Sequence, residues 1–302
     1  MKTELICVDI DGTLLKNDKE LSEEVKNSLT SAYNMGIKIA LVSGRMPSGV
    51  TLIERKLGFP CIKICNAGTF IMSGNECLDS CYLDKEVMLK IYNVYSPKYN
   101  IPLWVFKNEK WYVTGIDRYI EKERVDIQTE PRLTDINSLY KGWANEFGPN
   151  KILFGADPKI IQEIVDDLNE RNLPEIDIAR SADHFLEIFP KGVNKGTAMH
   201  RVCEIYSINP ENTMAFGDHE LDIPLIKEAG FGIAMGNAVE KLKAVADYVT
   251  LSNEEDGVAY AINKFVFEMC FAVENIIAFA YYFTLYNDEV GVAYDIKKFI
   301  LD

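Results

Sequence analysis

The chain has 302 residues and a mass of 34.2 kDa, more than a single hydrophobic core usually holds, so two domains are expected. With 48% hydrophobic and 26% charged residues, it has the composition of a globular protein, which excludes a disordered or fibrous chain. A formal net charge of −14 argues against nucleic acid as a partner, because such a surface repels phosphate backbones. An anionic substrate must therefore be met by a metal ion or by locally placed cations.

The cysteines and the apolar segments point to a cytoplasmic protein. There are seven cysteines without a CxxC pair, and three histidines are too few to complete a zinc framework, so we expect reduced, buried thiols. The N-terminal apolar stretch is too short and too acidic for a signal peptide. The longest apolar run, near residues 275–286, is shorter than the ~20 residues of a membrane span, so no membrane association is expected.

The N-terminal part of the chain alternates apolar runs with helical patterns. Residues 4–10 and 37–42 are apolar on both faces, as expected of buried strands. Between them, Ser22 is a candidate N-cap for a helix over 22–35, and Pro47 is well placed to begin the next helix. This alternation predicts an α/β fold with a doubly wound, mostly parallel, Rossmann-like sheet.

The middle of the chain has a different texture, and the alternation resumes after it. We predict a discontinuous core of residues 1–82 and 190–266, with residues 83–189 inserted as a second, α+β domain, here called the insert. Strands are expected in the insert at 101–106, 110–115, 151–156 and 185–189, with a helix at 158–171. In the second part of the core, helices are expected at 194–206, 221–228 and 238–246, with strands at 213–217 and 231–235.

The C-terminal extension, residues 267–302, is a tandem duplicate of about residues 231–265. At an offset of 34, segments 231–265 and 265–299 share 19 of 35 residues, against roughly one in fifteen expected by chance from average composition. The copy loses Gly236 and Asn237, which become Cys270 and Phe271, and it gains apolar residues. Packing of the copy on its own domain is favoured, a homodimer contact is an alternative, and disorder is a third.

Four loops at the carboxyl ends of predicted strands, or at the start of a helix, carry the chemistry. Asp9 and Asp11 are two residues apart, so both carboxylates point off the end of the first strand, and Gly12 permits a sharp turn. Taken singly, each loop has an ordinary structural explanation, such as a turn, a helix cap or a solvated side chain. Together they point to a ligand site at this edge of the sheet. The remaining members are Thr13, Ser43, Gly44, Lys195, Asp218 and Asp222.

These loops, in this order, resemble the four motifs of the haloacid dehalogenase superfamily: Asp-x-Asp-Gly-Thr, Ser-Gly-Arg, Asn-Lys-Gly and Gly-Asp-x-x-x-Asp. The segments 187–196, 234–238 and 255–259 are similar, more narrowly, to the Cof-like branch with a type IIB cap domain. The resemblance covers about residues 1–266 and leaves out the C-terminal extension.

The resemblance implies a Mg²⁺-dependent phosphatase for a small phosphorylated metabolite, such as a sugar phosphate or a phosphorylated cofactor precursor. It implies Asp9 as nucleophile, giving an aspartyl-phosphate, and Asp11 as general acid and then base. Phosphoryl oxygens would be held by Thr13, Ser43, Gly44 and Lys195. Mg²⁺ would bind Asp9, the backbone carbonyl of Asp11 and Asp218, with Asp222 in support. The clustering of carboxylates agrees independently, since they would repel one another without a cation among them.

One position departs from the family pattern. Leu221 stands where the Cof-like branch usually has Asn before the last aspartate, so one polar contact is missing, and His219 is a weak substitute. Reduced activity is therefore expected. This departure and the duplicated tail motivate an alternative function, a catalytically degenerate module that binds a ligand or a protein. A response-regulator receiver is a third class, but it would lack the insert and the Asp-Gly-Thr turn.

The insert is expected to act as a lid that excludes water from the substrate. Its candidate substrate contacts are Trp104, Arg118 and His184. Each has an ordinary alternative: a core aromatic for Trp104, a solvated cation for Arg118 and a polar group at a strand edge for His184. The sequence does not distinguish these alternatives.

Overall fold

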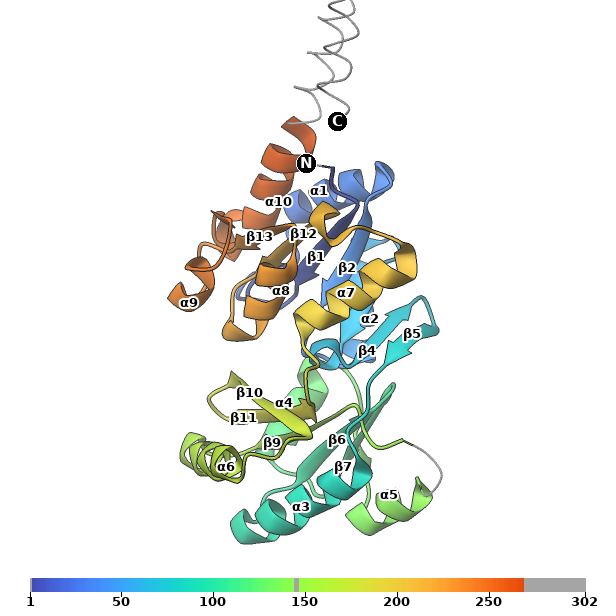
Figure 1. Cartoon of the computed structure of the whole chain (residues 1–302), viewed down its shortest axis with the longest axis vertical. Helices are drawn as coiled ribbons and strands as arrows, with labels where there is room; N and C mark the ends of the chain where they lie inside the picture. Colours follow the sequence, from blue (N-terminus) through green and yellow to red (C-terminus); the bar gives the residue numbers. More distant parts are fainter. Residues whose placement is uncertain (1, 144–146, 269–302) are drawn as a thin grey trace, which may run out of the picture.

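The computed structural model describes residues 2–143 and 147–268 of the chain. Two bodies are stacked along the long axis of the molecule, one containing the N-terminal strands and the other containing the insert (Figure 1). The C-terminal extension, with its predicted packing or dimer role, lies outside the described residues apart from its first two positions. Its packing on the core body, or at a dimer contact, therefore stays a prediction.

The larger sheet has eight strands in the order β14-β13-β12-β1-β2-β3-β4-β5. From β14 to β3 all neighbours are parallel, and β4 and β5 add an antiparallel hairpin at the edge. The predicted doubly wound, mostly parallel α/β fold is confirmed, although the hairpin was not predicted. The strands are β1 Leu5–Asp9, β2 Lys38–Val42, β3 Ile62–Cys65, β4 Phe70–Ser73, β5 Glu76–Ser80, β12 Thr213–Gly217, β13 Phe231–Ala234 and β14 Tyr248–Val249.

The helices of this body begin where capping residues allow. The Ser22 side chain accepts a hydrogen bond from the Val25 N–H, and Pro47 is the first residue of α2, both as predicted. The α-helices are α1 Glu23–Asn34, α2 Pro47–Leu57, α7 Lys195–Tyr206, α8 Ile223–Glu228, α9 Glu240–Lys243 and α10 Gly257–Ile262. Single-turn 3₁₀-helices are η1 Asn66–Gly68, η2 Pro210–Asn212, η3 Glu220–Asp222 and η4 Asn253–Glu255, and the π-helix η5 covers Asn263–Glu268.

The helix predicted over 238–246 is wrong in length, since α9 covers only Glu240–Lys243. At its start, the Val239 N–H is bonded to the carbonyl of Asp218 at 2.9 Å. At its end, the Asp247 N–H bonds to Gly232 at 2.8 Å and leads the chain into β14. The second of these contacts takes a backbone N–H that the last turn of a longer helix would use.

The insert folds around a second sheet of six strands in the order β10-β11-β9-β6-β7-β8. Its strands are β6 Leu103–Lys107, β7 Lys110–Val113, β8 Arg132–Leu133, β9 Lys151–Gly155, β10 Ile176–Ala182 and β11 Phe185–Pro190. Its helices are α3 Lys85–Tyr99, α4 Arg118–Asp126, α5 Ile136–Gly142 and α6 Pro158–Arg171. We propose that the domain boundaries lie where predicted, near 82/83 and 189/190, although β11 runs one residue past the second of them.

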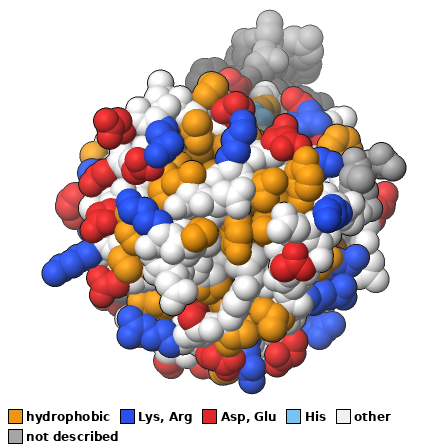
Figure 2. All heavy atoms as spheres, turned by 90° about the horizontal axis from the view of Figure 1, so that it is seen from below, with side chains coloured by type: hydrophobic (Ala, Val, Ile, Leu, Met, Phe, Trp, Pro, Cys, Tyr) orange, Lys and Arg blue, Asp and Glu red, His pale blue; other side chains and the backbone are white. Residues whose placement is uncertain are grey.

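Each body has its own apolar core. One cluster of buried residues surrounds the large sheet, and a separate one fills the insert. On the end of the molecule formed by the insert, charged side chains of both signs are interspersed with apolar ones (Figure 2). Within the part of the chain described, no helix has the length and apolar character needed to cross a bilayer. All six cysteines among the described residues are free thiols.

The central position of β12 gives a stability prediction. Phe216 lies in this strand with 0% of its surface exposed, so Phe216→Ala should lower the free energy of unfolding by about 3–5 kcal/mol, measured by urea titration. Phe147→Ala is the matched control, because Phe147 is 73% exposed and only stacks on Tyr82. The control should cost no more than ~1 kcal/mol. Equal losses in the two variants would contradict the described core.

Candidate active site

Three neighbouring strands of the large sheet end at one place. Asp9 is the last residue of β1, Ser43 directly follows β2, and Asp218 directly follows β12. Because β1 pairs in parallel with both β2 and β12, their carboxyl ends lie side by side. Lys195, the first residue of α7, joins them there. The structure therefore gathers residues that are more than 200 positions apart in the sequence, as predicted.

Lys195 is the cation at the centre of this group. Its ammonium donates to Asp9 Oδ1 at 2.6 Å and also to Asp222 Oδ1, and all three side chains are buried. Burial opposes its charge, but the carboxylates of Asp222 and Asp9 outweigh that effect and raise the pKa of Lys195. The lysine is therefore a fixed positive charge in a site shielded from water.

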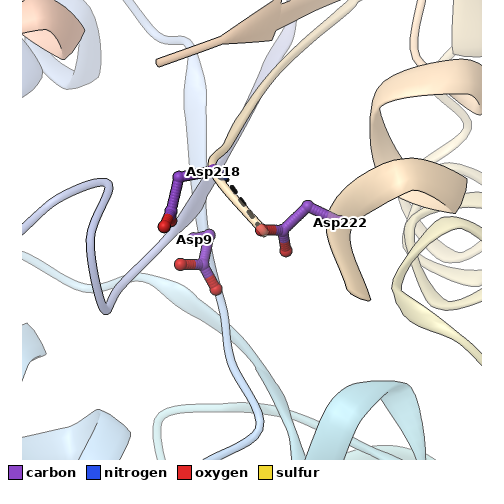
Figure 3. A group of neighbouring side chains, drawn as sticks. All are labelled: Asp9, Asp218 and Asp222. Carbon is purple, nitrogen blue, oxygen red and sulfur yellow. Dashed lines mark hydrogen bonds between the residues drawn. The ribbon is translucent and has the colours of Figure 1, made fainter. Parts of the chain in front are cut away.

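Both carboxylate oxygens of Asp222 are hydrogen-bonded within the protein. One of its carboxylate oxygens accepts from Lys195, and the other accepts from the backbone N–H groups of Asp218 and His219 at 3.1 and 2.9 Å. Figure 3 shows it beside Asp218, with the dashed bond to the backbone of that residue. Since both oxygens are engaged, Asp222 holds the loop that carries Asp218.

Asp218 faces the turn that follows β1. Its Oδ1 accepts a hydrogen bond from the Thr13 hydroxyl at 2.7 Å. Gly12 lies so close to it, with φ of +86°, that an added Cβ would be 2.4 Å from Asp218 Oδ2. Asn237, in turn, donates to the carbonyl of Gly12 at 2.8 Å. Glycine is therefore required here both for the backbone angle and for the space that the carboxylate occupies.

The donor set fits a small hard cation. Oxygens of Asp9, Asp218 and Asp222 all lie within 4.8 Å of one another, and Figure 3 shows the three side chains converging. Burial raises the pKa of Asp9 well above its usual range, and the nearby Asp222 carboxylate adds to this. Burial also raises the pKa of Asp218 to about 6. Carboxylates in this condition gain most from a bound cation, and all-oxygen donors suit Mg²⁺.

Asp11 is held away from these carboxylates. Arg45 binds it with two hydrogen bonds of 2.7 Å each, and Lys19 donates to it at 2.8 Å. Burial acts in the opposite direction, but these two cations together lower the pKa of Asp11 to about 2. In this arrangement Asp11 is a carboxylate whose two oxygens are bound by cations.

Ser43 and Gly44 form a short loop beside Asp9. The Ser43 N–H bonds to Ile64 and its carbonyl accepts from Ala67, both residues at the end of β3 or just after it. Ser43 Oγ accepts from the Arg45 N–H at 3.1 Å. Among the described residues the Gly44 N–H has no hydrogen-bond acceptor, so this donor and the Ser43 hydroxyl hydrogen are available to a ligand.

A cleft of about 850 Å³ opens from these residues toward the insert. Its walls include Asp9, Ser43, Lys195 and Asp218 from the core body, and Phe106, Phe185 and Glu187 from the insert. Of the three predicted lid contacts, His184 and Trp104 line the cleft, but Trp104 is almost fully buried in an aromatic cluster. Arg118 is exposed and lies over the ring of Tyr119, outside the cleft lining.

Several residues of the site were not singled out from the sequence. Arg45 was quoted only as part of a motif, without its role as the partner of Asp11. Lys151 and Glu187 come from strands of the insert, and their position beside Gly44 depends on how the two bodies meet. Asn237 belongs to the 234–238 segment and differs in the duplicated copy, but its contact with the Gly12 turn was not predicted. The pair Gly236-Asn237, a glycine followed by a polar side chain, was the sequence signal from which a turn contact could have been predicted.

Comparison with known proteins identifies the family to which this fold belongs. Residues 6–262 match the sequence model described as haloacid dehalogenase-like hydrolase. A haloacid dehalogenase-like hydrolase from Bacteroides thetaiotaomicron, known as a crystal structure, is 30% identical. It superposes with a TM-score of 0.78 over 87% of this chain and 99% of its own length. The predicted family resemblance is confirmed.

Two curated relatives are similar over most of this chain. The 5-amino-6-(5-phospho-D-ribitylamino)uracil phosphatase YcsE of Bacillus subtilis is 28% identical over 271 residues, covering 87% of this chain and 95% of the relative. The chloroplastic endoribonuclease YBEY of Arabidopsis thaliana is 28% identical over 278 residues. The match covers 88% of this chain but only 47% of that protein, so this chain corresponds to about half of it.

Cation binding should depend on pH through Asp218. Because its carboxyl has a pKa of about 6 in the folded protein, against 3.8 ordinarily, the cation-free fold binds this proton more tightly than the unfolded chain does. The cation-free protein should therefore lose stability as pH rises from about 4 to about 6. Mg²⁺ competes with the proton, so the rise in Tm that it produces should be larger at about pH 8 than at about pH 5.

Differential scanning fluorimetry with and without saturating Mg²⁺ measures this effect. Asp218→Asn should remove most of the Mg²⁺-dependent rise at both pH values, because an amide binds the cation weakly and does not titrate. A rise in Tm that is the same at both pH values in the unaltered protein would count against Asp218 as a ligand.

Proposed function

The chain belongs to the haloacid dehalogenase-like hydrolase family and is a phosphatase. We propose that it hydrolyses a small phosphorylated metabolite through an aspartyl-phosphate intermediate, with Mg²⁺ as cofactor. The observation that carries this proposal is the buried contact of 2.6 Å between Asp9 and Lys195, with Asp218 alongside. A nucleophile, a fixed cation and a cation-binding carboxylate are the groups that phosphoryl transfer requires.

The proposed first step joins Asp9 to phosphorus. A carboxylate oxygen of Asp9 attacks the phosphoryl group, the P–O bond to the leaving group breaks, and Asp11 donates a proton to the departing oxygen. In the second step Asp11 takes a proton from water, which attacks phosphorus and releases phosphate and free Asp9. Asp11 serves both steps because the alcohol leaves and the water enters on the same face.

The other residues bind and neutralise the phosphoryl group. Lys195 offsets the charge that develops on its oxygens, and the Ser43 hydroxyl and Gly44 N–H donate to them. Mg²⁺, bound by Asp9, the Asp11 carbonyl and Asp218, would polarise the phosphoryl group. Thr13 is predicted to contact a phosphoryl oxygen, which requires its hydroxyl to turn from Asp218. Asp11 must likewise be released from Arg45 and Lys19 and take up a proton from water before it can act as an acid.

The substrate is proposed only by class. The cleft is walled on the insert side by apolar and polar side chains and is large enough for a sugar-sized or larger leaving group. The ribitylaminouracil phosphate named for the Bacillus subtilis relative is a reasonable first compound to assay, together with sugar phosphates. We propose a cytoplasmic location, which agrees with the free thiols.

Removal of the nucleophile tests the proposal. Hydrolysis of p-nitrophenyl phosphate by the unaltered protein should require Mg²⁺, and Asp9→Asn should abolish it, with a loss of at least about a thousandfold in kcat. Asp183→Asn is a control, since Asp183 is exposed on the insert. If Mg²⁺ made no difference, or if Asp9→Asn stayed active, the covalent mechanism would be wrong. An inactive but phosphate-binding protein would favour the alternative of a degenerate binding module.

Leu221 gives a second test. It lines the cleft next to Asp222, where the related enzymes usually carry an amide side chain. Leu221→Asn should raise kcat/KM, by up to about tenfold to a hundredfold on the general scale for contacts to outer residues. Leu221→Ala separates the effect of the amide from that of removing bulk. Unchanged turnover in Leu221→Asn would show that the missing amide does not limit this enzyme.

A further inference from the structure

A buried ion pair of the insert lies against the phosphate-binding loop. Lys151 is the first residue of β9 and Glu187 lies within β11, and their side chains meet at 3.0 Å. They are only 2% and 3% exposed, although both border the cleft. Neither residue has a place in the chemistry proposed above, so the pair needs a separate explanation.

Lys151 also reaches across from the insert to the core body. Its ammonium donates to the carbonyl of Gly44 at 2.8 Å. The carbonyls on either side, those of Ser43 and Arg45, are bound within the core body by the N–H groups of Ala67 and Asn66, each at 2.9 Å. The middle carbonyl of this loop is thus the one that the insert holds.

The peptide that Lys151 holds is fixed at its other end by Ser43. The carbonyl of Gly44 and the N–H of Arg45 belong to one planar peptide unit, and that N–H donates to Ser43 Oγ at 3.1 Å. Because Ser43 Oγ accepts this bond, its own hydrogen is directed elsewhere, as a phosphate donor needs. Rotation of this peptide would therefore disturb both the Ser43 hydroxyl and the Arg45 Cα, from which the arginine side chain extends.

Glu187 completes the arrangement. It satisfies the ammonium of Lys151, and its Oε1 would be 3.4 Å from a Cβ at position 44, so it packs against the glycine of the loop. Burying two charges removes both from water at a large cost in free energy, which their attraction must repay, and an apolar pair would often be as stable. A requirement beyond stability explains why a charged pair occupies this position.

Resting on the proposed function, we infer that Lys151 and Glu187 are positioning residues that couple the placement of the insert to the phosphate-binding loop. With the insert seated, Lys151 orients the Gly44–Arg45 peptide and thereby the Ser43 hydroxyl. With the insert displaced, that bond is lost and the loop binds phosphate less well.

The pair is tested by replacing it without leaving a lone buried charge. In Lys151→Met/Glu187→Leu, both groups become apolar, so the fold should persist. We expect kcat/KM for p-nitrophenyl phosphate to fall about tenfold to a hundredfold, and the Kd for inorganic phosphate, measured by calorimetry, to rise about tenfold. The single variant Lys151→Arg, which keeps Glu187, should show smaller losses of kcat/KM and of phosphate affinity than the double variant. A guanidinium can also donate to a carbonyl and a carboxylate.

A second buried lysine provides the matched control. Lys63 is 1% exposed and paired with Glu54 at 2.7 Å, but it lies on β3, outside the cleft lining. Lys63→Met/Glu54→Leu should keep kcat/KM within about twofold in folded protein. In a Ser43→Ala background, the Lys151→Met/Glu187→Leu change should cause little further loss, because it acts through the missing hydroxyl.

The outcomes separate this inference from the proposed function. If the unaltered protein hydrolyses the ester and the double variant keeps both its kcat/KM and its Kd for phosphate, the pair is merely structural and the inference is wrong. If the unaltered protein does not hydrolyse any ester, the proposed function fails, and the Kd for phosphate still decides whether the pair positions the loop. Losses as large in the Lys63 control would also overturn the inference.

Discussion

The bridge made by Lys195 between Asp9 and Asp222 is the contact on which the rest of the site depends. When all three are ionised, Asp9, Asp218 and Asp222 bring three negative charges into a largely buried region, and Lys195 supplies one positive charge. The remaining charge of −2 (−3 + 1) equals in magnitude the charge of one Mg²⁺. Burial of uncompensated charge is costly for a stable fold, so the proposed Mg²⁺ would complete the charge balance of the site as well as serve its chemistry.

The close approach of two loops is the matching steric constraint. The turn at Gly12 and the loop at Asp218 touch so closely that only a glycine fits. Asn237 ties this turn to the region after β13, and its side-chain Oδ1 accepts a hydrogen bond from the N–H of Asn253. The site is therefore closed by residues from both ends of a discontinuous core body. The insert interrupts the core body in the sequence, but the strands before and after it still pair, as β1 and β12 do.

Much of this arrangement was predictable because it depends on local patterns. Asp9, Ser43, Lys195 and Asp218 follow strands or begin a helix, and the parallel order of the sheet then brings them together without further information. Contacts between the two bodies were not predictable in this way. Whether Lys151 of the insert faces solvent or Gly44 depends on the placement of one sheet against another, which no local spacing encodes. The β4–β5 hairpin was missed because its second strand is polar and partly exposed.

The duplicated sequence in the tail can be judged by what the first copy does. In the first copy, Asn237 donates a hydrogen bond to the Gly12 carbonyl. The neighbouring backbone leaves no room for a side chain at Gly236, since a Cβ there would lie 2.7 Å from the Ser252 nitrogen. The second copy has Phe271 and Cys270 at these positions, and Asp295 in place of the fully buried Ala261. The sequence of the copy therefore lacks the asparagine that holds the Gly12 carbonyl and the glycine that fits beside Ser252 in the first copy.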